Sequence, residues 1–218
     1  MAVYLKKFET QSAYEAAQSS LILPNVSLTV DNNTVHYNPS SPTPPTPSYE
    51  SVDLGLPSGT LWAKYNVGAT SETEYGNYYQ YGKGAAQYAA TSGDSDYSGT
   101  ENPLALSADT AAQVWGGSWH IPTSAQCAEL TANTTYEWTT IDGVNGGKFT
   151  AQNGNYIFIP AANSAVNESV GDYCQIWCST SFVQFDILRV YSMFSDNEGI
   201  SIGADELNFG FSVRGVIG

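Results

Sequence analysis

Apolar and polar residues alternate along two short segments near the start of the chain, Val26–Val30 and Thr34–Tyr37. A period of two is typical of a strand with one buried face. Between the segments, Asp31, Asn32 and Asn33 favour a tight turn because short polar side chains tolerate left-handed backbone conformations. The pattern therefore predicts a β-hairpin.

The hairpin is preceded by the start signal of a helix. Residues Ser12 to Glu15 have the form of a capping box, which predicts a short helix ending at about Ser20. A helix and one hairpin bury too little apolar surface to be stable alone. We expect residues 1–38 to form a leader that folds against an assembly partner or against copies of itself.

A proline-rich tract, residues 39–48, follows the leader. Proline donates no backbone hydrogen bond and favours polyproline II, so the tract is expected to be a semi-rigid linker. Such a tract is also a ligand for domains with aromatic grooves, and this alternative stays open. The linker interpretation predicts a second domain over residues 49–218.

The second domain is predicted to contain two short helices. The first spans about Ala108 to Val114, and the second follows Pro122, where Thr123 to Gln126 form another capping box. The remaining pattern is typical of strands and loops. With its short strands, this domain is expected to belong to the α+β class, with several short antiparallel strands.

Three strand-bearing regions are recognisable in that domain. Lys148–Ala151 and Asn155–Ile159 flank Asn153-Gly154, which is a strong turn signal. Phe185–Tyr191 and Phe209–Val216 are expected to be further strands.

Composition and charge exclude several classes of partner. Charged residues make up only 13% of the 218 residues, and 21 acidic against 7 basic side chains give a formal charge of −14. Such a chain repels nucleic-acid backbones and anionic lipid surfaces, so neither is expected as a main partner. The apolar runs are too short for a membrane span, and the first residues lack the pattern of a secretory signal. We expect synthesis and folding in the cytoplasm.

The cysteines and the acidic residues offer little for cofactor chemistry. Cys127, Cys174 and Cys178 are odd in number, so we expect small buried residues rather than a disulfide framework. A zinc site with His120 lacks an evident fourth ligand. A loop with Asp94, Asp96 and Glu101 could hold calcium, although a solvated loop is the simpler interpretation. We expect no metal and no cofactor.

The segment around Trp177 carries the candidate site. It combines aromatic, apolar and small polar side chains, as binding faces do when aromatics supply rigid contact area and polar groups supply adaptable hydrogen bonds. The alternative is that half of these positions belong to the core. The candidate ligand-binding residues are Tyr173, Gln175, Ile176, Ser181, Phe182, Val183, Gln184, Phe185 and Asp186.

Several motifs give the chain a family resemblance. They are Val52–Ala63, Gly76–Tyr79 with Gly82–Gly84, Trp115–Thr123, Trp177-Cys178-Ser179-Thr180 and Gly210-Phe211-Ser212-Val213-Arg214. Together they resemble the Fibrobacter-type major paralogous domain of gut Bacteroidetes and their phages, which belongs to the C-type-lectin fold group. The segment from Phe8 to Ser27 and the segment from Val35 to Pro39 resemble the N-terminal leader of Bacteroides phage structural proteins.

The resemblance implies a C-type-lectin-like fold and a variable ligand face. In relatives carried by diversity-generating retroelements, a variable region lies between a Trp-Ser-Ser-Thr-like motif and the terminal Gly-Phe-Ser-Val-Arg. Here Cys178 replaces the usual serine and Cys174 the usual aromatic residue. We expect Arg214 and His120 to be structural. We also expect the tryptophans of these stretches to be core anchors, namely Trp62, Trp115, Trp119, Trp138 and Trp177.

These features predict a virion protein made in the host cytoplasm, which attaches to other virion proteins or to its own copies and binds a host surface protein or glycan. A structural decoration or assembly protein and a host surface adhesin are the alternatives. An enzyme is not expected, since the sequence lacks catalytic motifs. The C-type-lectin fold group also includes formylglycine-generating enzymes, which use a pair of cysteines, so Cys174 and Cys178 are a candidate for such a pair. On an extended strand, however, these two residues would be more than ~12 Å apart.

Overall fold

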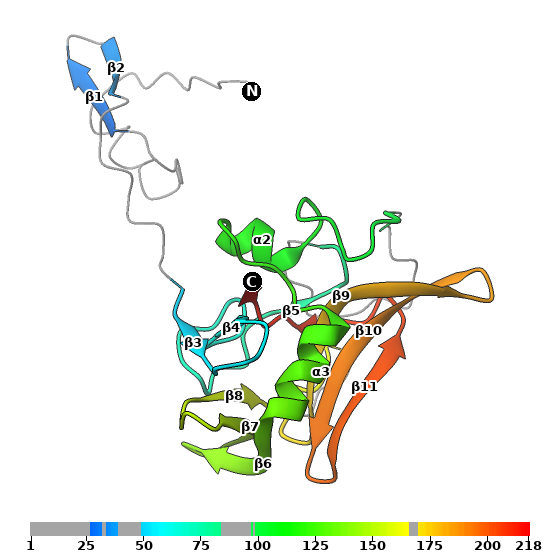
Figure 1. The fold of residues 1–218 in the computed structure, drawn as a ribbon. Helices are drawn as coiled ribbons and strands as arrows, with labels where there is room; N and C mark the ends of the chain where they lie inside the picture. The colour runs from blue at the N-terminus through cyan, green and yellow to red at the C-terminus, as the bar shows by residue number, and fades with distance from the viewer. Residues whose placement is uncertain (1–26, 32–33, 39–48, 84–96, 98, 166–169) are drawn as a thin grey trace. The chain divides into compact units, whose positions relative to one another are not determined.

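The computed structural model describes residues 27–31, 34–38, 49–83, 97, 99–165 and 170–218 (Figure 1). The chain divides into two compact units, Met1–Ser48 and Tyr49–Gly218.

The first unit contains the predicted hairpin. Strands β1 (Ser27–Asp31) and β2 (Thr34–Asn38) pair antiparallel, with Leu28 opposite Tyr37 and Val30 opposite Val35. The prediction of a hairpin here is confirmed. The expected helix before it and the proline-rich tract after it lie outside the described residues.

The second unit is an α+β structure of mostly antiparallel strands. Within its described residues, two short helices accompany three sheets. The largest sheet has the order β11-β10-β9-β12-β5, and its strands are β5 (Tyr78–Tyr79), β9 (Cys174–Gln184), β10 (Ile187–Asp196), β11 (Gly199–Asp205) and β12 (Phe211–Ser212).

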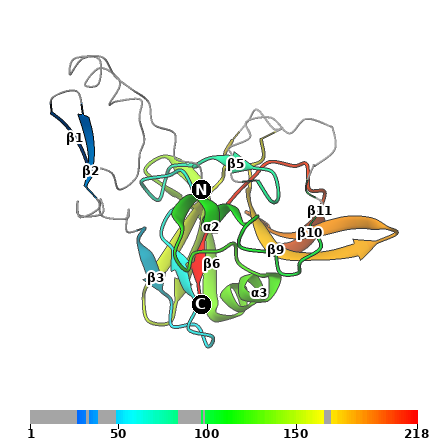
Figure 2. The same cartoon turned by 90° about the horizontal axis from the view of Figure 1, so that it is seen from above.

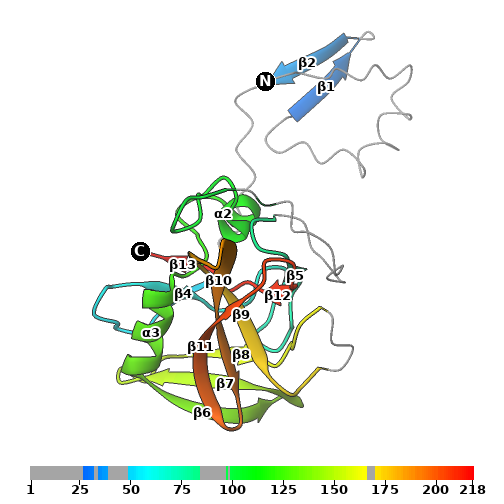
Figure 3. The same ribbon diagram turned by 90° about the vertical axis from the view of Figure 1, so that its right-hand side faces the viewer.

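Two three-stranded sheets complete the unit. The order β13-β4-β3 joins β3 (Ser51–Asp53), β4 (Leu61–Ala63) and β13 (Val216–Ile217). The order β6-β7-β8 joins β6 (Thr134–Ile141), β7 (Val144–Ala151) and β8 (Tyr156–Pro160). Figure 3 shows this sheet crossing the end of the largest sheet, where the Tyr136 hydroxyl donates to the Asp196 carbonyl.

Both predicted helices form. Helix α2 (Thr110–Trp115) begins after Asp109, whose carboxylate accepts from the Ala112 amide. Helix α3 (Ser124–Asn133) begins with the predicted capping box, in which Thr123 and Gln126 satisfy each other's backbone amides. Helix α3 packs on β6 and β7 and on β9, β10 and β11, so it joins two sheets.

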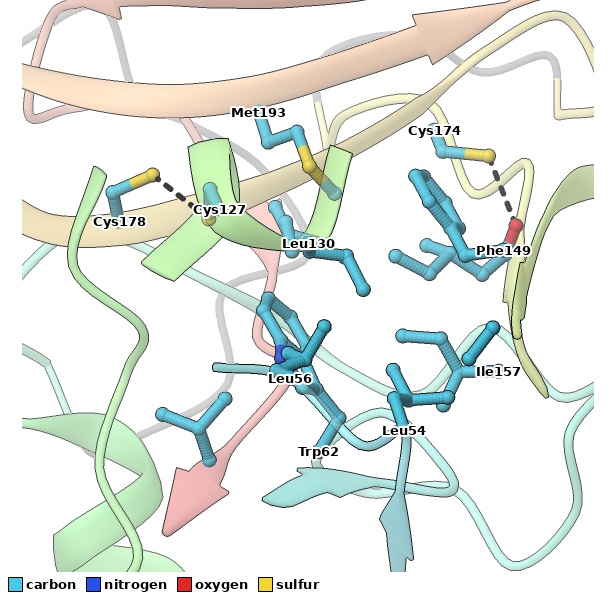
Figure 4. Packing of buried hydrophobic residues seen from close by; sticks show 14 of the residues in the cluster. Leu54, Leu56, Trp62, Cys127, Leu130, Phe149, Ile157, Cys174, Cys178 and Met193 are labelled. Carbon is cyan, nitrogen blue, oxygen red and sulfur yellow. Dashed lines mark hydrogen bonds between the residues drawn. The ribbon is translucent and has the colours of Figure 1, made fainter. Parts of the chain in front are cut away.

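Two apolar cores hold the second unit together. The first lies beneath α3 and includes Trp62, Leu130, Phe149 and Met193 (Figure 4). The second surrounds Trp177, whose indole nitrogen donates to the Tyr79 carbonyl over 2.7 Å. All three cysteines are free and buried, as expected. Four tryptophans are buried and Trp138 is partly buried against the first core, which agrees with the prediction that they are core anchors.

Arg214 is a fully buried cation that ties the chain together. Its guanidinium donates to the carbonyls of Ala63, Lys64 and Phe158 and to the side-chain oxygen of Asn66, over 2.6 to 3.0 Å. Burial lowers its pKa to about 9. The expected structural role is confirmed. His120 is structural too, since its two ring nitrogens contact the carbonyls of Ile121 and Gly218.

The strand predictions need three corrections. Phe185 and Asp186 are not in a strand but form the turn between β9 and β10. Strands β3, β4, β5, β6, β9 and β11 were not predicted. The region Phe209–Val216 holds the two-residue strand β12 and the start of β13 rather than one long strand. In contrast, the turn at Asn153-Gly154 between β7 and β8 is confirmed.

Candidate functional site

The longest hairpin of the second unit carries the candidate site. Strands β9 and β10 pair through Ser181 with Val190, Phe182 with Arg189, Val183 with Leu188 and Gln184 with Ile187. Strand β11 pairs with β10 only as far as Val190, and β12 pairs with β9 at Ile176, so among the described residues neither strand pairs with residues 182–189. Figures 1 and 2 show it extending past the rest of the largest sheet. We call residues 182–189 the hairpin tip.

The turn of the hairpin tip has an unusual residue in an unfavourable conformation. Phe185 and Asp186 have φ angles of 52° and 61°, both in the left-handed region. Two such residues suit the right-handed twist of a hairpin, but the positions favour Gly, Asn or Asp. A side chain such as Phe there costs roughly 1 kcal/mol or more. Phe185 therefore stays in this turn at a cost in stability.

The hairpin tip also exposes apolar surface. Phe185 is 89% exposed, Val183 68% and Ile187 53%. These three account for half of the six large hydrophobic side chains that are exposed among the described residues. Such a concentration of exposed apolar residues in one short segment is typical of interaction sites, whereas single exposed apolar residues are ordinary.

Contacts at the base hold the hairpin tip in place. On one face the rings of Phe182 and Tyr191 pack with centroids 5.0 Å apart. Arg189 forms an ion pair with Glu206 over 3.1 Å. Leu188 packs against the second core.

A residue far away in the sequence completes this base. The Asn102 side chain donates to the Ser181 carbonyl over 2.8 Å and accepts from the Ser181 amide over 3.1 Å. These two bonds satisfy the backbone groups of Ser181, as a neighbouring strand would do. Sequence reasoning missed Asn102, because a single asparagine in a loop carries no pattern that reveals its partner.

The predicted site residues fall into three groups. Phe182, Val183, Gln184, Phe185 and Asp186 lie together on the hairpin tip, all exposed except the half-buried Phe182.

The second group lies at the other end of β9 and is half-buried. Tyr173 stacks on Phe194 with ring centroids 5.1 Å apart. Gln175 donates to Ser192 and to Asp205 over 3.1 and 3.0 Å. Since these contacts occupy both side chains within the sheet, this group is not part of the hairpin tip.

The third group, Ile176 and Ser181, is buried, and the expectation that both are displayed is corrected. Ile176 has no exposed surface and lies in the first core with Cys174 and Cys178. Alternation along β9 explains this, since every second side chain faces α3. Trp177 faces the second core on the opposite side. The middle of β9 is therefore buried on both faces.

Outside the hairpin tip, the described residues of the second unit form a groove with polar contacts along it. A groove of about 400 Å³ is lined by residues that include Lys64, Glu72 and Tyr156. Lys64 pairs with Glu50 over 2.8 Å, and the Tyr156 hydroxyl donates to Glu72 over 3.3 Å. The described residues hold no cluster of three His, Cys, Asp or Glu side chains placed to bind a metal. Asp94 and Asp96 of the acidic loop lie outside them.

Neither helix in the described part of the chain is long and apolar enough to cross a membrane. In comparisons with known proteins, no family model, no curated protein and no solved structure matches the chain.

Proposed function

We propose that this chain is a virion-associated receptor-binding protein of a phage that infects Bacteroides, and that its hairpin tip binds a protein on the host surface. In this proposal residues 1–38 attach to other virion proteins or to copies of themselves, residues 39–48 are a linker, and residues 49–218 have a C-type-lectin-like fold. The observation that carries the binding role is Phe185, an exposed aromatic residue held in a left-handed turn.

The burial pattern supports a framework that displays a changeable surface. Trp177, Cys178 and Ser179 are buried, and so are Gly210 to Arg214 at the other motif. Between these motifs lie the exposed positions of the hairpin tip. A buried frame around an exposed segment is what the resemblance to retroelement-diversified proteins leads us to expect.

The chemistry of the hairpin tip favours a protein partner over a glycan. Val183, Phe185 and Ile187 offer aliphatic and aromatic surface that gains roughly 1.5 to 3 kcal/mol per side chain when fully buried. Asp186 beside them and the acidic chain as a whole complement a basic rim. The proposed partner is a host surface protein with an apolar pocket and basic residues around it.

A second candidate function uses the same surface. In a structural decoration or assembly protein, the hairpin tip would pack against a neighbouring virion protein instead of a host protein. Antibody labelling of intact particles against residues 182–189 separates the two, because the receptor-binding role requires that the hairpin tip is accessible on the particle.

Binding to host cells tests the proposal. The change is Phe185→Asn, which removes the aromatic ring and suits the left-handed turn, so folding is preserved. We expect cell binding of the purified chain, measured by flow cytometry, to fall at least about tenfold, as for the loss of an interface anchor.

The matched control is Leu106→Asn, which removes an exposed apolar side chain outside the hairpin tip. It should bind as the unmodified chain does. If Phe185→Asn also binds as the unmodified chain does, the proposed role of the hairpin tip is refuted. Pretreatment of the cells with protease or periodate distinguishes a protein receptor from a glycan, and loss of binding after periodate alone would overturn the choice of a protein.

A further inference from the structure

Two cysteines from different elements meet inside the first core. Cys127 on α3 and Cys178 on β9 have their sulfur atoms 3.4 Å apart, although they are 51 positions apart in sequence (Figure 4). Both are fully buried. The Cys178 thiol donates to the Cys127 sulfur, so the two groups are each other's polar partner.

The third cysteine provides an internal comparison. Cys174 lies four positions before Cys178 on the same strand and faces the same core, but its thiol donates to the Ile159 carbonyl over 2.9 Å. The two cysteines that are nearest in sequence are therefore not the pair. The packing of α3 on β9 makes the pair instead.

Little movement separates the two thiols from a covalent bond. A disulfide has a sulfur–sulfur distance of about 2.05 Å, so the sulfurs must approach by about 1.4 Å. Rotation about the side-chain bonds of both residues moves the sulfurs on this scale. The two elements that carry them are already packed against each other, so no new contact between α3 and β9 has to form.

We propose that Cys127 and Cys178 are an oxidation site that closes to an internal disulfide when the folded chain meets hydrogen peroxide. The proposal is independent of the function proposed above.

The reaction is balanced with peroxide as the oxidant. The thiolate of one cysteine attacks a peroxide oxygen, the O–O bond breaks, and a sulfenic acid and hydroxide form. The second sulfur then attacks the sulfenic sulfur, which forms the S–S bond and expels hydroxide. The two protons released from the thiols convert both hydroxides to water. The two sulfurs lose two electrons and the peroxide gains them.

Burial of the two cysteines determines which oxidant can reach them and how fast the disulfide forms. A small neutral peroxide can reach a buried sulfur during brief openings of the core, whereas a bulky disulfide such as oxidised glutathione cannot be accommodated there. The neighbouring Cys178 thiol and burial raise the pKa of the Cys127 thiol well above its ordinary value. Thiolate is therefore scarce, and we expect slow formation of a lasting cross-link rather than a fast sensor response.

The bond would join α3 to the strand that leads to the hairpin tip. It closes a loop from residue 127 to residue 178 and restricts the unfolded chain. We expect the midpoint of thermal unfolding to rise by roughly 5 °C or more after oxidation. Reduction by dithiothreitol in denaturant, followed by refolding, should remove this gain.

The experiment treats the native full chain with hydrogen peroxide, alkylates the remaining thiols in denaturant, and maps the peptides by mass spectrometry. The expected product has lost two hydrogen atoms, links Cys127 to Cys178, and carries one alkyl group on Cys174. The Cys174→Ala variant should form the same link, while Cys127→Ala and Cys178→Ala should not.

Three alkylated cysteines, a link through Cys174, or sulfinic acid in place of the link would each overturn the proposal. The peptide map of the unmodified chain decides this even if an alanine variant fails to fold. Oxidation of the urea-unfolded chain is the control, since it should give a mixture of the three pairings.

Discussion

The side chain of Asn102 forms two hydrogen bonds with the backbone of Ser181, as donor to its carbonyl and as acceptor from its amide. This contact lies where β9 leaves the sheet and continues into the hairpin tip. Asn102→Ala removes both bonds and leaves two backbone groups without partners. We expect the free energy of unfolding to fall by about 2 kcal/mol, measured by urea denaturation.

The same variant should loosen the hairpin tip more than the rest of the unit. Amide hydrogen exchange of residues 182–189 should accelerate, while exchange in α3 should change only in proportion to global stability. Gln113→Ala is the control, because its side chain makes one exposed bond to the Ser107 carbonyl. If the hairpin tip keeps its protection in Asn102→Ala, Asn102 does not hold it.

Core and surface positions around β9 should respond differently to truncation. Trp62→Ala and Trp177→Ala each leave a cavity at a fully buried position and should cost on the order of 3 to 5 kcal/mol. Val183→Ala, on the hairpin tip, should change stability by only about 0.5 kcal/mol. Thermal melts of the three variants give the comparison, and a large loss for Val183→Ala would place this residue in the core.

Where the sequence carries a local signal, the fold follows it. The capping box at Thr123 begins α3, and Asn153-Gly154 forms the turn between β7 and β8. The turn between β6 and β7 has the same kind of signal, Asp142-Gly143, with φ angles of 48° and 82°. This hairpin was therefore predictable, although it was not predicted.

Strand β9 and its turn were not predictable from such signals. The strand is buried on both faces, so its apolar residues do not alternate with polar ones and the pattern of a half-buried strand is missing. Its turn has Phe185 where Gly or Asn is usual. For the same reasons the candidate site was predicted only in part, as a continuous segment instead of an exposed hairpin tip that follows a buried strand.

Protonation of the Asp109 carboxylate should contribute to the stability of the second unit at low pH. This buried carboxylate accepts from the Ala112 and Ile121 amides, but burial raises its pKa above the ordinary 3.8. The folded state therefore binds the proton at a higher pH than the unfolded chain. The contribution of Asp109 to stability is largest below the unfolded pKa and declines as the pH rises from about 4 through the raised folded pKa.

The measurement compares urea unfolding of the unmodified chain and Asp109→Asn at several pH values. The asparagine does not titrate, so the stability difference between the two proteins should change over this window and become constant above it. A difference that is independent of pH between about 4 and 7 would contradict the raised pKa.

Removal of residues 1–48 tests the division of the chain. Among the described residues, both apolar cores are formed entirely between Tyr49 and Gly218, so the second unit should fold without the first. We expect unchanged circular dichroism and a similar melting temperature, together with loss of incorporation into particles. Incorporation of the truncated chain would contradict the attachment role of the leader, and failure to fold would contradict the independence of the second unit.

The turn at Phe185 should be more stable without its aromatic ring. Phe185→Asn places a residue that tolerates positive φ at a position where φ is 52°, and it removes a ring that is 89% exposed and makes little contact with the core. We therefore expect the free energy of unfolding to rise by roughly 1 kcal/mol, which corresponds to an increase of about 2 to 4 °C in the melting temperature of a unit of this size. Thermal unfolding by calorimetry checks this.

Asp186→Asn is the control, since it changes the neighbouring turn residue without removing a ring and should leave the melting temperature nearly unchanged. A lower melting temperature for Phe185→Asn would mean that the ring stabilises the fold, and the exposed phenylalanine would then need no binding partner to explain it.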